Sequence, residues 1–296
     1  MPPSSSAAVM RSLLYVPGSS ERFIAKAHER GADAIILDLE DAVVPAEKSA
    51  ARARLAAAVP SVAQHGATVL VRINAEPERM RLDAEAACRA GAFGLLVPKA
   101  RDARTLQQLA AWMDEVEGGM GRPPMAFIPM IEDAGAVLDA RSIAAGSPRV
   151  FGLVAGGEDL AAALDADPTP EVLYLPKLMV HLAAKATGVR SFGLLRTVAD
   201  YGDLAAVEKS AHEARAFGFD GASCVHPSVV PILNRAFSPS QQALEHARRL
   251  VAAAGEAKAR GEGAFAFEGK MVDEPVVRRA QALLRRGSNS SASGSH

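Results

Sequence analysis

Two short apolar segments near the middle of the chain each lead into a carboxylate side chain. Residues 126–131 are followed directly by Glu132, and residues 150–156 lead into the segment that contains Asp159. The residues between them, 134–146, carry apolar side chains at helical spacing. Uninterrupted apolar runs are typical of strands that are buried on both faces of a parallel sheet. Because parallel neighbours end at the same edge, we expect Glu132 and Asp159 to lie side by side.

Two carboxylates this close repel each other unless a cation or a shared proton separates them. A hard divalent cation binds oxygen ligands and keeps several waters in its shell, and Mg²⁺ fits such a pair. The sequence therefore predicts a Mg²⁺ site with Glu132 and Asp159 as ligands. The alternative is that both are ordinary surface carboxylates paired with lysines.

The same alternation of apolar strands and helical segments extends over most of the chain. The other expected strands cover residues 12–16, 34–39, 68–73, 94–97, 191–197 and 221–225. The expected helices cover residues 21–30, 46–58, 79–90, 102–116, 171–187, 204–217 and 243–259. Eight strands alternating with helices indicate an α/β fold of the (β/α)8 TIM-barrel type. A doubly wound sheet is the alternative, but Pro17-Gly18-Ser19-Ser20 lacks the glycine pattern of a dinucleotide-binding turn.

Polar residues follow several of these expected strands at their C-terminal ends. In a (β/α)8 barrel that edge, here called the rim, carries the active site. The agreement of several strands makes the case for a functional site at the rim, and the residues in question are Asp38, Glu40, Arg72, Lys99, Glu132, Asp159 and His226.

The expected domain organisation is one barrel with terminal additions. Residues 1–10 are rich in Ser, Pro and Ala and are expected to be a disordered tail, and the barrel is expected to cover residues 11–260. Residues 261–286 contain a short hairpin-like stretch and a helix over 274–285, which suggest a lid or an oligomerisation segment. Residues 287–296 are rich in Gly and Ser and are expected to be a disordered tail.

Composition and charge exclude several classes of protein. The net charge is -1 and the pI is about 6.7, which gives no basic surface for nucleic acid. Two cysteines, Cys88 and Cys224, are too few for a disulfide framework or a zinc site, so a reducing cytoplasmic setting is expected. The N-terminus does not have the pattern of a signal peptide, and no run of 18 apolar residues predicts a membrane helix.

Eight short segments resemble, in order, those of one enzyme family. They are Arg11-Ser12-Leu13-Leu14-Tyr15-Val16-Pro17-Gly18, Leu37-Asp38-Leu39-Glu40-Asp41, Val71-Arg72-Ile73-Asn74, Val97-Pro98-Lys99, Pro129-Met130-Ile131-Glu132, Gly157-Glu158-Asp159-Leu160, Cys224-Val225-His226-Pro227-Ser228 and Gly269-Lys270-Met271-Val272-Asp273. Together they resemble the citrate lyase β-subunit-like proteins of the HpcH/HpaI aldolase and malyl-CoA/citramalyl-CoA lyase group. The resemblance covers about residues 11 to 285.

The resemblance implies a Mg²⁺-dependent carbon–carbon lyase or condensing enzyme that acts on acyl-CoA thioesters such as malyl-, citramalyl- or citryl-CoA. By this resemblance Glu132 and Asp159 match the metal ligands, with Glu132 also at the substrate. Arg72 matches the arginine that holds the substrate carboxylate or carbonyl. Asp273 matches a catalytic lid aspartate that, in some relatives, enters the neighbouring subunit's site. Family members are commonly trimers or hexamers, so a homo-oligomer is expected.

The sequence departs from the family pattern at four places that bear on the acyl group and the CoA contacts. One is the loop after the sixth expected strand, which reads Asp165-Ala166-Asp167-Pro168-Thr169-Pro170. Val229 stands where the family usually has Gln, and Lys177 stands near a position often held by Arg. Residues 193–197 read Gly-Leu-Leu-Arg-Thr instead of a stretch that contains Asp-Thr. The residues that match the metal ligands and the arginine are unchanged.

Several rim residues have two interpretations. Asp38, Glu40 and Asp41 are candidates for orienting Arg72 and metal-bound water, with direct catalysis as the alternative. Arg72 itself could contact substrate, form an ion pair with Asp38 or Glu40, or do both. Lys99 could form a Schiff base, but a buried structural ion pair is preferred.

Three further features also have an ordinary structural explanation. Cys224 and His226 could be a nucleophile pair, although a packed cysteine and a rim histidine are preferred. Arg22 could meet CoA phosphates or lie on a solvated helix face. Asp273 could act as an acid or base from a lid, or could be a docking contact.

Four functions follow from these residues and from the resemblance. The first is cleavage or condensation of the acyl-CoA by retro-Claisen or aldol chemistry. The second is hydrolysis of the thioester, if Asp273 activates water. The third is a subunit that works only with partners in a citrate lyase, and the fourth is a CoA-independent aldolase of 2-oxo acids.

Overall fold

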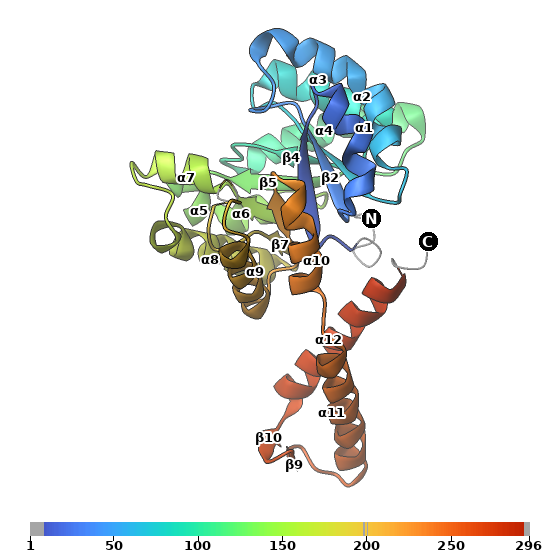
Figure 1. The fold of residues 1–296 in the computed structure, drawn as a ribbon, viewed down its shortest axis with the longest axis vertical. Helices are drawn as coiled ribbons and strands as arrows, with labels where there is room; N and C mark the ends of the chain where they lie inside the picture. The colour runs from blue at the N-terminus through green and yellow to red at the C-terminus, as the bar shows by residue number, and fades with distance from the viewer. Residues whose placement is uncertain (1–8, 198, 200, 293–296) are drawn as a thin grey trace. The chain divides into compact units, whose positions relative to one another are not determined.

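In the computed structural model, which describes residues 9–197, 199 and 201–292, eight parallel strands form a barrel (Figure 1). Their order is β7-β6-β5-β4-β3-β2-β1-β8. The strands are β1 Ser12–Pro17, β2 Ala34–Asp38, β3 Thr68–Arg72, β4 Gly94–Val97, β5 Ala126–Ile131, β6 Gly152–Ala155, β7 Arg190–Phe192 and β8 Ala222–Cys224. The predicted (β/α)8 barrel is confirmed.

The barrel closes between its first and last strands in the order, β7 and β8. Phe192 and Gly221 form a single parallel bridge there. The main-chain N–H of Gly193 donates to the carbonyl of Gly221 at 2.9 Å, and that of Asp220 donates to the carbonyl of Ser191 at 2.8 Å. A side chain at Gly221 would place its Cβ 1.9 Å from the carbonyl oxygen of Met10, which precedes β1, so only glycine fits at position 221.

Alternate strand residues pack into two separate apolar layers, as the two-residue period of a strand requires. The inner layer fills the barrel and the outer layer lies between the strands and the helices. On β5, for example, Ile128 and Met130 belong to the inner cluster while Phe127 and Ile131 belong to the outer one. Since both faces are covered, all six residues of β5 are buried, which explains the uninterrupted apolar run.

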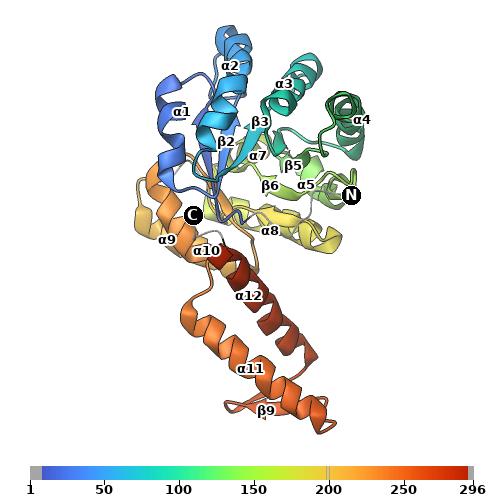
Figure 2. The same ribbon diagram turned by 90° about the vertical axis from the view of Figure 1, so that its right-hand side faces the viewer.

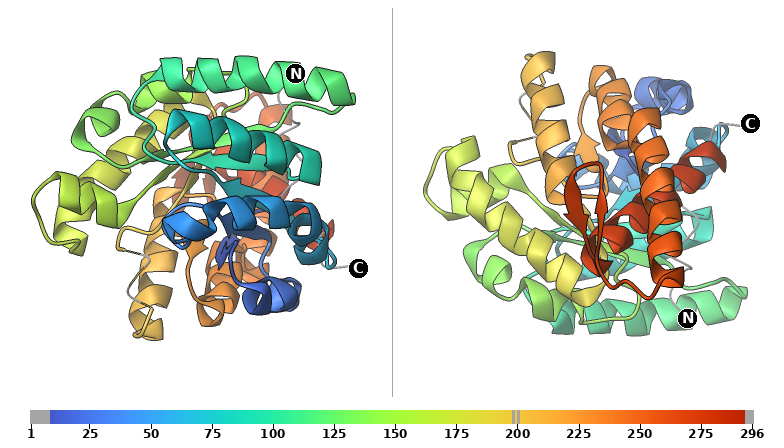
Figure 3. Two further views of the ribbon diagram at one scale, coloured as in Figure 1. Left: turned by 90° about the horizontal axis from the view of Figure 1, so that it is seen from above. Right: turned by 90° about the horizontal axis from the view of Figure 1, so that it is seen from below.

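Helices connect the strands and cover the outside of the barrel (Figure 3). They are α1 Glu21–Ala27, α2 Lys48–Val62, α3 Pro77–Ala90, α4 Ala103–Met120, α5 Ala134–Leu138, α6 Ala140–Ala144, α7 Gly157–Ala163, α8 Pro170–Thr187, α9 Leu204–Phe217 and α10 Val230–Phe237, with the 3-10 turns η1 His28–Arg30, η2 Pro45–Glu47 and η3 Pro227–Val229. Several of these helices are capped at their N-termini by short polar side chains. The side chains of Ser20, Asp102 and Thr169 accept hydrogen bonds from the first turns of α1, α4 and α8.

Three expectations about local structure were wrong. The single helix expected over residues 134–146 is two helices, α5 and α6, because the backbone leaves the helical region at Asp139. The strand expected over 191–197 ends at Phe192, since the carbonyls of Leu194 and Arg196 accept from the Lys177 ammonium instead. The helices α7 and α10 were not anticipated.

Residues 238–296 form a second compact unit, described as far as residue 292. It contains α11 Gln241–Ala259, the antiparallel strands β9 Phe265–Phe267 and β10 Lys270–Val272, and α12 Glu274–Ala292. Figure 2 shows α11 and α12 running side by side. Their shared apolar cluster consists of Ala247, Leu250, Val272, Val277 and Ala280.

The expected boundary after residue 260 therefore differs from the one observed after Phe237. The helix α11, which we had assigned to the barrel, packs with α12, and α10 packs against β1 in its place. The helix α12 also continues to Ala292, into the segment 287–296 that was expected to be disordered. Gly287 is buried against Leu244, and the Ser288 hydroxyl donates to the carbonyl of Leu284 at 3.1 Å.

At the N-terminus, residues 1–8 of the expected tail over 1–10 lie outside the described residues, whereas Met10 is buried in the inner cluster. Among the described residues, no helix combines the length and the apolar character needed to cross a bilayer.

Candidate functional site

The alternation of inward-facing and outward-facing residues along each strand also determines where the polar residues at the strand ends lie. Ile36 on β2, Leu70 on β3 and Met130 on β5 all point into the barrel interior. Two residues further along each chain segment, the next inward positions are Asp38, Arg72 and Glu132. These three side chains therefore lie at the mouth of the barrel, and all three line one cavity there.

The cavity has a volume of about 410 Å³. One part of its lining is charged and another part is apolar. The lining residues are Tyr15, Pro17, Asp38, Asp41, Ala42, Arg72, Met130, Glu132, Val154, Ala155, Gly156, Gly157, Glu158, Asp159, Ser223 and Val225.

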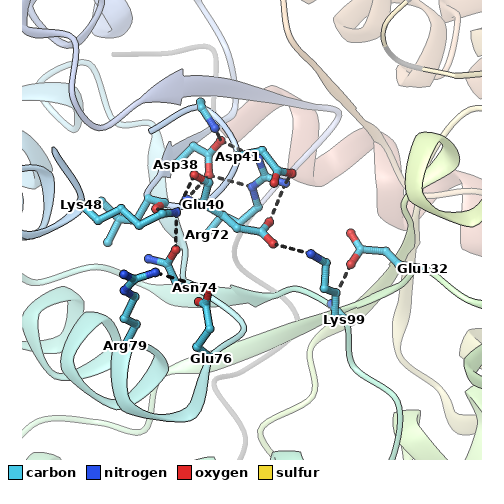
Figure 4. A network of polar contacts seen from close by, with 12 residues as sticks. Asp38, Glu40, Asp41, Lys48, Arg72, Asn74, Glu76, Arg79, Lys99 and Glu132 are labelled. Atoms are coloured by element: carbon cyan, nitrogen blue, oxygen red, sulfur yellow. Dashed lines mark hydrogen bonds and ion pairs between the residues drawn. The ribbon is translucent and has the colours of Figure 1, made fainter. Parts of the chain in front are cut away.

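Arg72 is held by three carboxylates, one at the end of β2 and two in the loop that follows it (Figure 4). Its Nε donates to Oδ1 of Asp38 at 2.7 Å and its Nη2 donates to Oδ2 at 2.6 Å, which is a bidentate pair. Its Nη1 lies 2.9 Å from Oε2 of Glu40 and donates to Oδ2 of Asp41 at 3.0 Å. Burial opposes the charge of Arg72, but the hydrogen bonds and charge of Asp38, together with Tyr15 and Glu40, outweigh it, so that the pKa of the guanidinium is raised. The ion pair that we considered for Arg72 is therefore present.

Tyr15 lies beneath the guanidinium. The ring centroid is 5.2 Å from the central carbon of the Arg72 guanidinium, a cation–π distance. Burial raises the pKa of Tyr15, with Arg72 acting in the opposite direction. The phenol thus stays neutral and supports the arginine from the barrel interior. The sequence offered no signal for this role beyond the inward position of Tyr15 on β1.

Glu40 joins Arg72 to Lys99. Its Oε1 is 3.6 Å from the ammonium nitrogen of Lys99. Burial raises the pKa of Glu40 to about 7, while Arg72 lowers it and Asp41 raises it further. Glu40 contacts these two cations and is not among the residues that line the cavity. The ion pair expected for Lys99 is present, but Lys99 is not buried, since 47% of its side chain is exposed.

Glu132 is buried directly after β5, with 4% of its surface exposed. Its Oε2 accepts a hydrogen bond from the main-chain N–H of Lys99 at 2.7 Å. Lys99 adopts a left-handed backbone conformation, with φ of 50°, as the chain turns there. Burial raises the pKa of Glu132 to about 8, the Lys99 N–H lowers it, and the charge of Asp159 raises it.

A glycine makes room for this carboxylate. A Cβ at Gly156 would lie 2.7 Å from Cγ and 2.8 Å from Oε1 of Glu132. Such distances are below van der Waals contact, so no other residue fits at position 156 without moving Glu132. Two adjacent glycines after an apolar run are the sequence signal that could have revealed this close approach.

Asp159 lies in the first turn of α7 and not at the end of β6 as expected, because the helix starts at Gly157. It nevertheless lines the same cavity as Glu132 and influences its pKa, so the two carboxylates are brought together. Within the described ranges, no group of three or more His, Cys, Asp or Glu side chains is placed so that it could hold a metal ion. A cation here would therefore need oxygens from water or substrate.

The donors present fit a hard divalent cation. Both are carboxylates, and Glu132 is buried with a raised pKa. Because residue 156 is a glycine, no side chain at that position covers Oε1 of Glu132. A cation beside Glu132 would offset the cost of its burial in the ionised form. Glu132 and Asp159 are the residues that would hold such an ion.

Lys177 is a buried residue whose role the sequence did not reveal. Its ammonium donates to the carbonyls of Leu194 at 3.0 Å and Arg196 at 2.7 Å. Burial lowers the pKa of Lys177 to about 8, with Glu158 acting in the opposite direction. It therefore holds the segment that follows β7 and lies close to Gly157, at the start of α7.

The remaining candidates lie elsewhere. Cys224 is buried in the outer cluster, and burial raises its pKa to about 12. His226 is exposed at the rim, where its Nδ1 is 2.7 Å from Oγ of Ser228, so the preferred interpretation of a packed cysteine and a rim histidine is confirmed. Arg22 lies on the exposed part of α1, with its guanidinium 5.0 Å from the ring centroid of Phe23.

Asp273 belongs to the second unit, between β10 and α12. Its main-chain carbonyl accepts from the N–H groups of Val276 and Val277, both at 3.1 Å. Its Oδ1 accepts a long hydrogen bond of 3.4 Å from the N–H of Val276. The residue thus caps the start of α12.

Comparison with known proteins gives one consistent result. Residues 11–227 match the family described as HpcH/HpaI aldolase/citrate lyase. A citrate lyase subunit beta from Leuconostoc mesenteroides subsp. cremoris is 31% identical over 281 residues, which covers 93% of this chain and 92% of that protein. A (3S)-malyl-CoA thioesterase from Cereibacter sphaeroides is 36% identical over 282 residues, which covers 93% of this chain and 94% of that protein.

Solved structures agree with these matches. The protein CitE from Mycobacterium tuberculosis, crystallised in complex with magnesium, acetoacetate and coenzyme A, superposes with a TM-score of 0.74 at 34% identity. The match covers 95% of this chain and 99% of that one. A citrate lyase from Burkholderia xenovorans LB400 superposes with a TM-score of 0.82 at 21% identity, a likeness that concerns the fold alone.

Proposed function

The chain belongs to the HpcH/HpaI aldolase/citrate lyase family, and from this premise we propose that it is a Mg²⁺-dependent carbon–carbon lyase or condensing enzyme. The proposed substrates are 3-hydroxyacyl-CoA thioesters such as malyl-CoA, citramalyl-CoA or citryl-CoA. The coenzyme A and magnesium bound to the related CitE protein support this substrate class and this metal.

The observation that carries the proposal is the environment of Glu132. A carboxylate that is buried and close to the charge of Asp159 is costly to ionise, even though the Lys99 N–H donates a hydrogen bond to it. A cation held by Glu132 and Asp159 would remove that cost. When bound there, Mg²⁺ would supply positive charge and a fixed orientation for the oxygens of the hydroxy acid or 2-oxo acid.

Arg72 would bind the carboxylate or carbonyl oxygen of that same end of the substrate. Two of its three acidic partners are buried, but 61% of the Asp41 side chain is exposed. Asp41 is therefore the partner that an incoming carboxylate would replace at Nη1. Asp38 would keep the guanidinium in place meanwhile, because its bidentate pair uses Nε and Nη2.

The proposed cleavage breaks the bond between the hydroxyl-bearing carbon and the carbon next to the thioester. The hydroxyl loses its proton and becomes the carbonyl of the 2-oxo acid or aldehyde. The electron pair of the broken bond passes into the thioester enolate, whose carbon then takes up a proton to give the acyl-CoA. We propose Asp273 as the group that moves these protons, from its own subunit or from that of a neighbouring copy in a homotrimer or hexamer.

Hydrolysis of the thioester is the second candidate, and the 36% identity to a (3S)-malyl-CoA thioesterase favours considering it. In this reaction a water oxygen bonds to the thioester carbonyl carbon, the carbon–sulfur bond breaks, and the thiol of CoA leaves with a proton. The same Asp273 would activate the water. The two reactions differ in whether the carbon–carbon bond of the acyl group survives.

The test is a product assay on the purified full chain with malyl-CoA, citramalyl-CoA and citryl-CoA, each with and without Mg²⁺. Thiol release and 2-oxo acid or aldehyde formation are measured in parallel. Glu132→Gln is the test variant, and Glu115→Gln, an exposed glutamate on α4, is its matched control. We expect Mg²⁺-dependent carbonyl product and acyl-CoA from the wild type and from Glu115→Gln, but not from Glu132→Gln.

Other outcomes would assign other functions. Free thiol with an intact hydroxy acid would assign thioester hydrolysis. Turnover of free 2-oxo acids, with no activity on thioesters, would assign a CoA-independent aldolase. Activity that appears only after a second protein is added would assign a partner-dependent citrate lyase subunit. We also propose a cytoplasmic setting, which the two free cysteines support, and light scattering would measure the oligomeric state.

A further inference from the structure

Four polar side chains form a chain of hydrogen bonds beside the rim, and none of them lines the cavity. Lys48 and Arg52 lie one turn apart on α2, Asn74 follows β3, and Asp83 lies on α3. We infer that Lys48, supported by this chain of hydrogen bonds, is a positioning residue that holds the loop after β2 in the shape required by Arg72. Its importance for turnover rests on the proposed function.

Lys48 is buried, with 9% of its surface exposed. Its ammonium donates to the carbonyl of Leu39 at 3.1 Å, to the carbonyl of Glu40 at 2.9 Å and to Oδ1 of Asn74 (Figure 4). An ammonium group has three N–H donors, so all three are used. Two of them bind the same loop, at successive peptide groups.

The other members of the chain fix Asn74, the acceptor that follows β3. The main-chain N–H of Asn74 donates to Oδ2 of Asp83 at 3.0 Å and its side-chain amide donates at 2.6 Å. The Nε of Arg52 donates to Oδ1 of Asp83 at 2.6 Å. Asp83 is fully buried, and both of its oxygens are bonded. Asn74 therefore presents its oxygen to Lys48 in one fixed orientation.

The loop after β2 is held from two directions. Asp38 accepts from the N–H of Glu40 at 2.8 Å and from the N–H of Ala42 at 3.2 Å. Lys48 binds the carbonyls of the same loop from the other side. The peptide groups around Glu40 are thus tied at both N–H and carbonyl. The backbone of the loop is therefore fixed, and it holds the side chains of Glu40 and Asp41 at their contacts with Arg72.

Asp38 binds both the loop and Arg72, because the same two carboxylate oxygens that accept from the loop N–H groups also accept from the guanidinium. Its bonds to the loop cannot be altered without altering the arginine. Lys48 donates to the loop and to Asn74, and none of its three acceptors belongs to Arg72 or to the cavity lining. Changing Lys48 therefore loosens the loop while every group that faces substrate stays chemically unchanged.

The test compares Lys48→Met, which keeps the length of the side chain and removes its donors, with Arg149→Met. Arg149 is an equally buried cation that donates to Glu117 at 2.9 Å and to the carbonyl of Met125, near the N-terminal ends of β5 and β6. Both variants should lose stability. Only Lys48→Met should loosen the loop.

Two measurements are made on each full-length variant under conditions where it is folded by circular dichroism. The first is amide hydrogen exchange in peptides that cover residues 39–44, which needs no substrate. The second is kcat and KM with the thioester that the wild type turns over. We expect Lys48→Met to raise exchange in this loop by about tenfold. We also expect kcat to fall about 10- to 100-fold, with KM changing by less than about threefold.

The two measurements separate the inference from the proposed function. A wild type without turnover on any thioester would remove the proposed function, and the exchange result would still decide the positioning role. Unchanged exchange in residues 39–44 of Lys48→Met would overturn the inference. So would a fall in kcat for Arg149→Met as large as that for Lys48→Met, because loss of stability would then account for both.

Discussion

The main-chain N–H of Lys99 donates a 2.7 Å hydrogen bond to Oε2 of Glu132, while the ammonium of the same residue lies 3.6 Å from Oε1 of Glu40. One residue thus contacts the carboxylate proposed to bind metal and the carboxylate that holds Arg72. The contact to Glu132 comes from the peptide group, so it does not depend on which side chain stands at position 99.

Lys99→Ala should therefore keep the metal site and remove only the link to Glu40. We expect stabilisation by Mg²⁺ to remain and kcat/KM to fall less than about tenfold, since the ion pair is half exposed and weak. A Schiff-base lysine would instead be indispensable. Loss of all turnover in Lys99→Ala, or covalent trapping of a 2-oxo acid on Lys99 by borohydride, would contradict this expectation.

The raised pKa of Glu132 gives a definite pH dependence to the metal-free protein. Glu132 has a pKa of about 8 when folded and an ordinary value of 4.5. Between these values the folded chain keeps a proton that the unfolded chain has lost, so stability falls as pH rises. Glu40, with a pKa of about 7, contributes in the same direction. Glu132→Gln should flatten this fall, as measured by urea unfolding across pH 5 to about 8.

Mg²⁺ should reverse that trend, because binding requires the ionised carboxylate and releases its proton. The rise in melting temperature on adding Mg²⁺ should therefore grow from about pH 5 to about pH 8. In Glu132→Gln the rise should be absent at every pH. A pH-independent rise in the wild type would show that Glu132 is not a ligand.

Arg72→Lys should be severe although the charge is kept. A lysine cannot reproduce the bidentate pair with Asp38 or reach Glu40 and Asp41 at once. We expect kcat/KM to fall by about 100-fold or more. Arg89→Lys is the control, because Arg89 forms an exposed ion pair with Glu85 and its replacement should change stability by less than about 0.5 kcal/mol.

Gly156→Ala should disable the metal site through a single methyl group. The added Cβ would lie 2.8 Å from Oε1 of Glu132, so the carboxylate must turn away from the cavity. We expect Mg²⁺ to stop stabilising the variant in a thermal-shift assay. Gly118→Ala on α4 meets nothing within 4 Å and should be neutral or stabilising by about 0.5–1 kcal/mol. Equal Mg²⁺ responses in both variants would refute the role of Gly156.

Cys224→Ala should retain turnover per folded molecule. Its thiol is packed among apolar side chains and its pKa is raised to about 12, so little thiolate exists at neutral pH. The native thiol should also resist alkylation by iodoacetamide until the protein is unfolded. Rapid alkylation of the folded protein together with loss of turnover would restore Cys224 as a candidate nucleophile.

Much of the barrel could be predicted because its strands are buried on both faces. Residues 126–131 and 94–97 are apolar without interruption, and the polar residue that ends each run marks the rim. The helix α7 was missed since Gly156 and Gly157 read as a turn and the helix has only seven residues. The helix α11 was misassigned because an amphipathic pattern does not say which element covers its apolar side.

The charged residues that line the cavity could be picked out from the sequence, but the buried lysines that hold the neighbouring loops could not. Asp38, Arg72 and Glu132 stand out because a charge at the end of an apolar run needs a reason. Lys48 and Lys177 do not, since a lysine within a helical pattern is usually solvated and only the fold shows that these two are buried. Apart from the side chain of Asn74, their acceptors are main-chain carbonyls, which a sequence does not reveal.

The charged groups of the cavity come from one part of the barrel mouth, after β2, β3, β5 and β6, whereas β1 and β8 contribute Tyr15, Pro17, Ser223 and Val225. In the proposed binding mode the hydroxyl-bearing carbon of malyl-CoA would have three different contacts: its hydroxyl at the cation held by Glu132 and Asp159, its carboxylate at Arg72, and its thioester arm toward β1 and β8. Mirror-image molecules cannot both satisfy three different contacts at one carbon. The uneven distribution of charge around the mouth therefore favours one enantiomer of the substrate, and only half of a racemic malyl-CoA sample should be consumed.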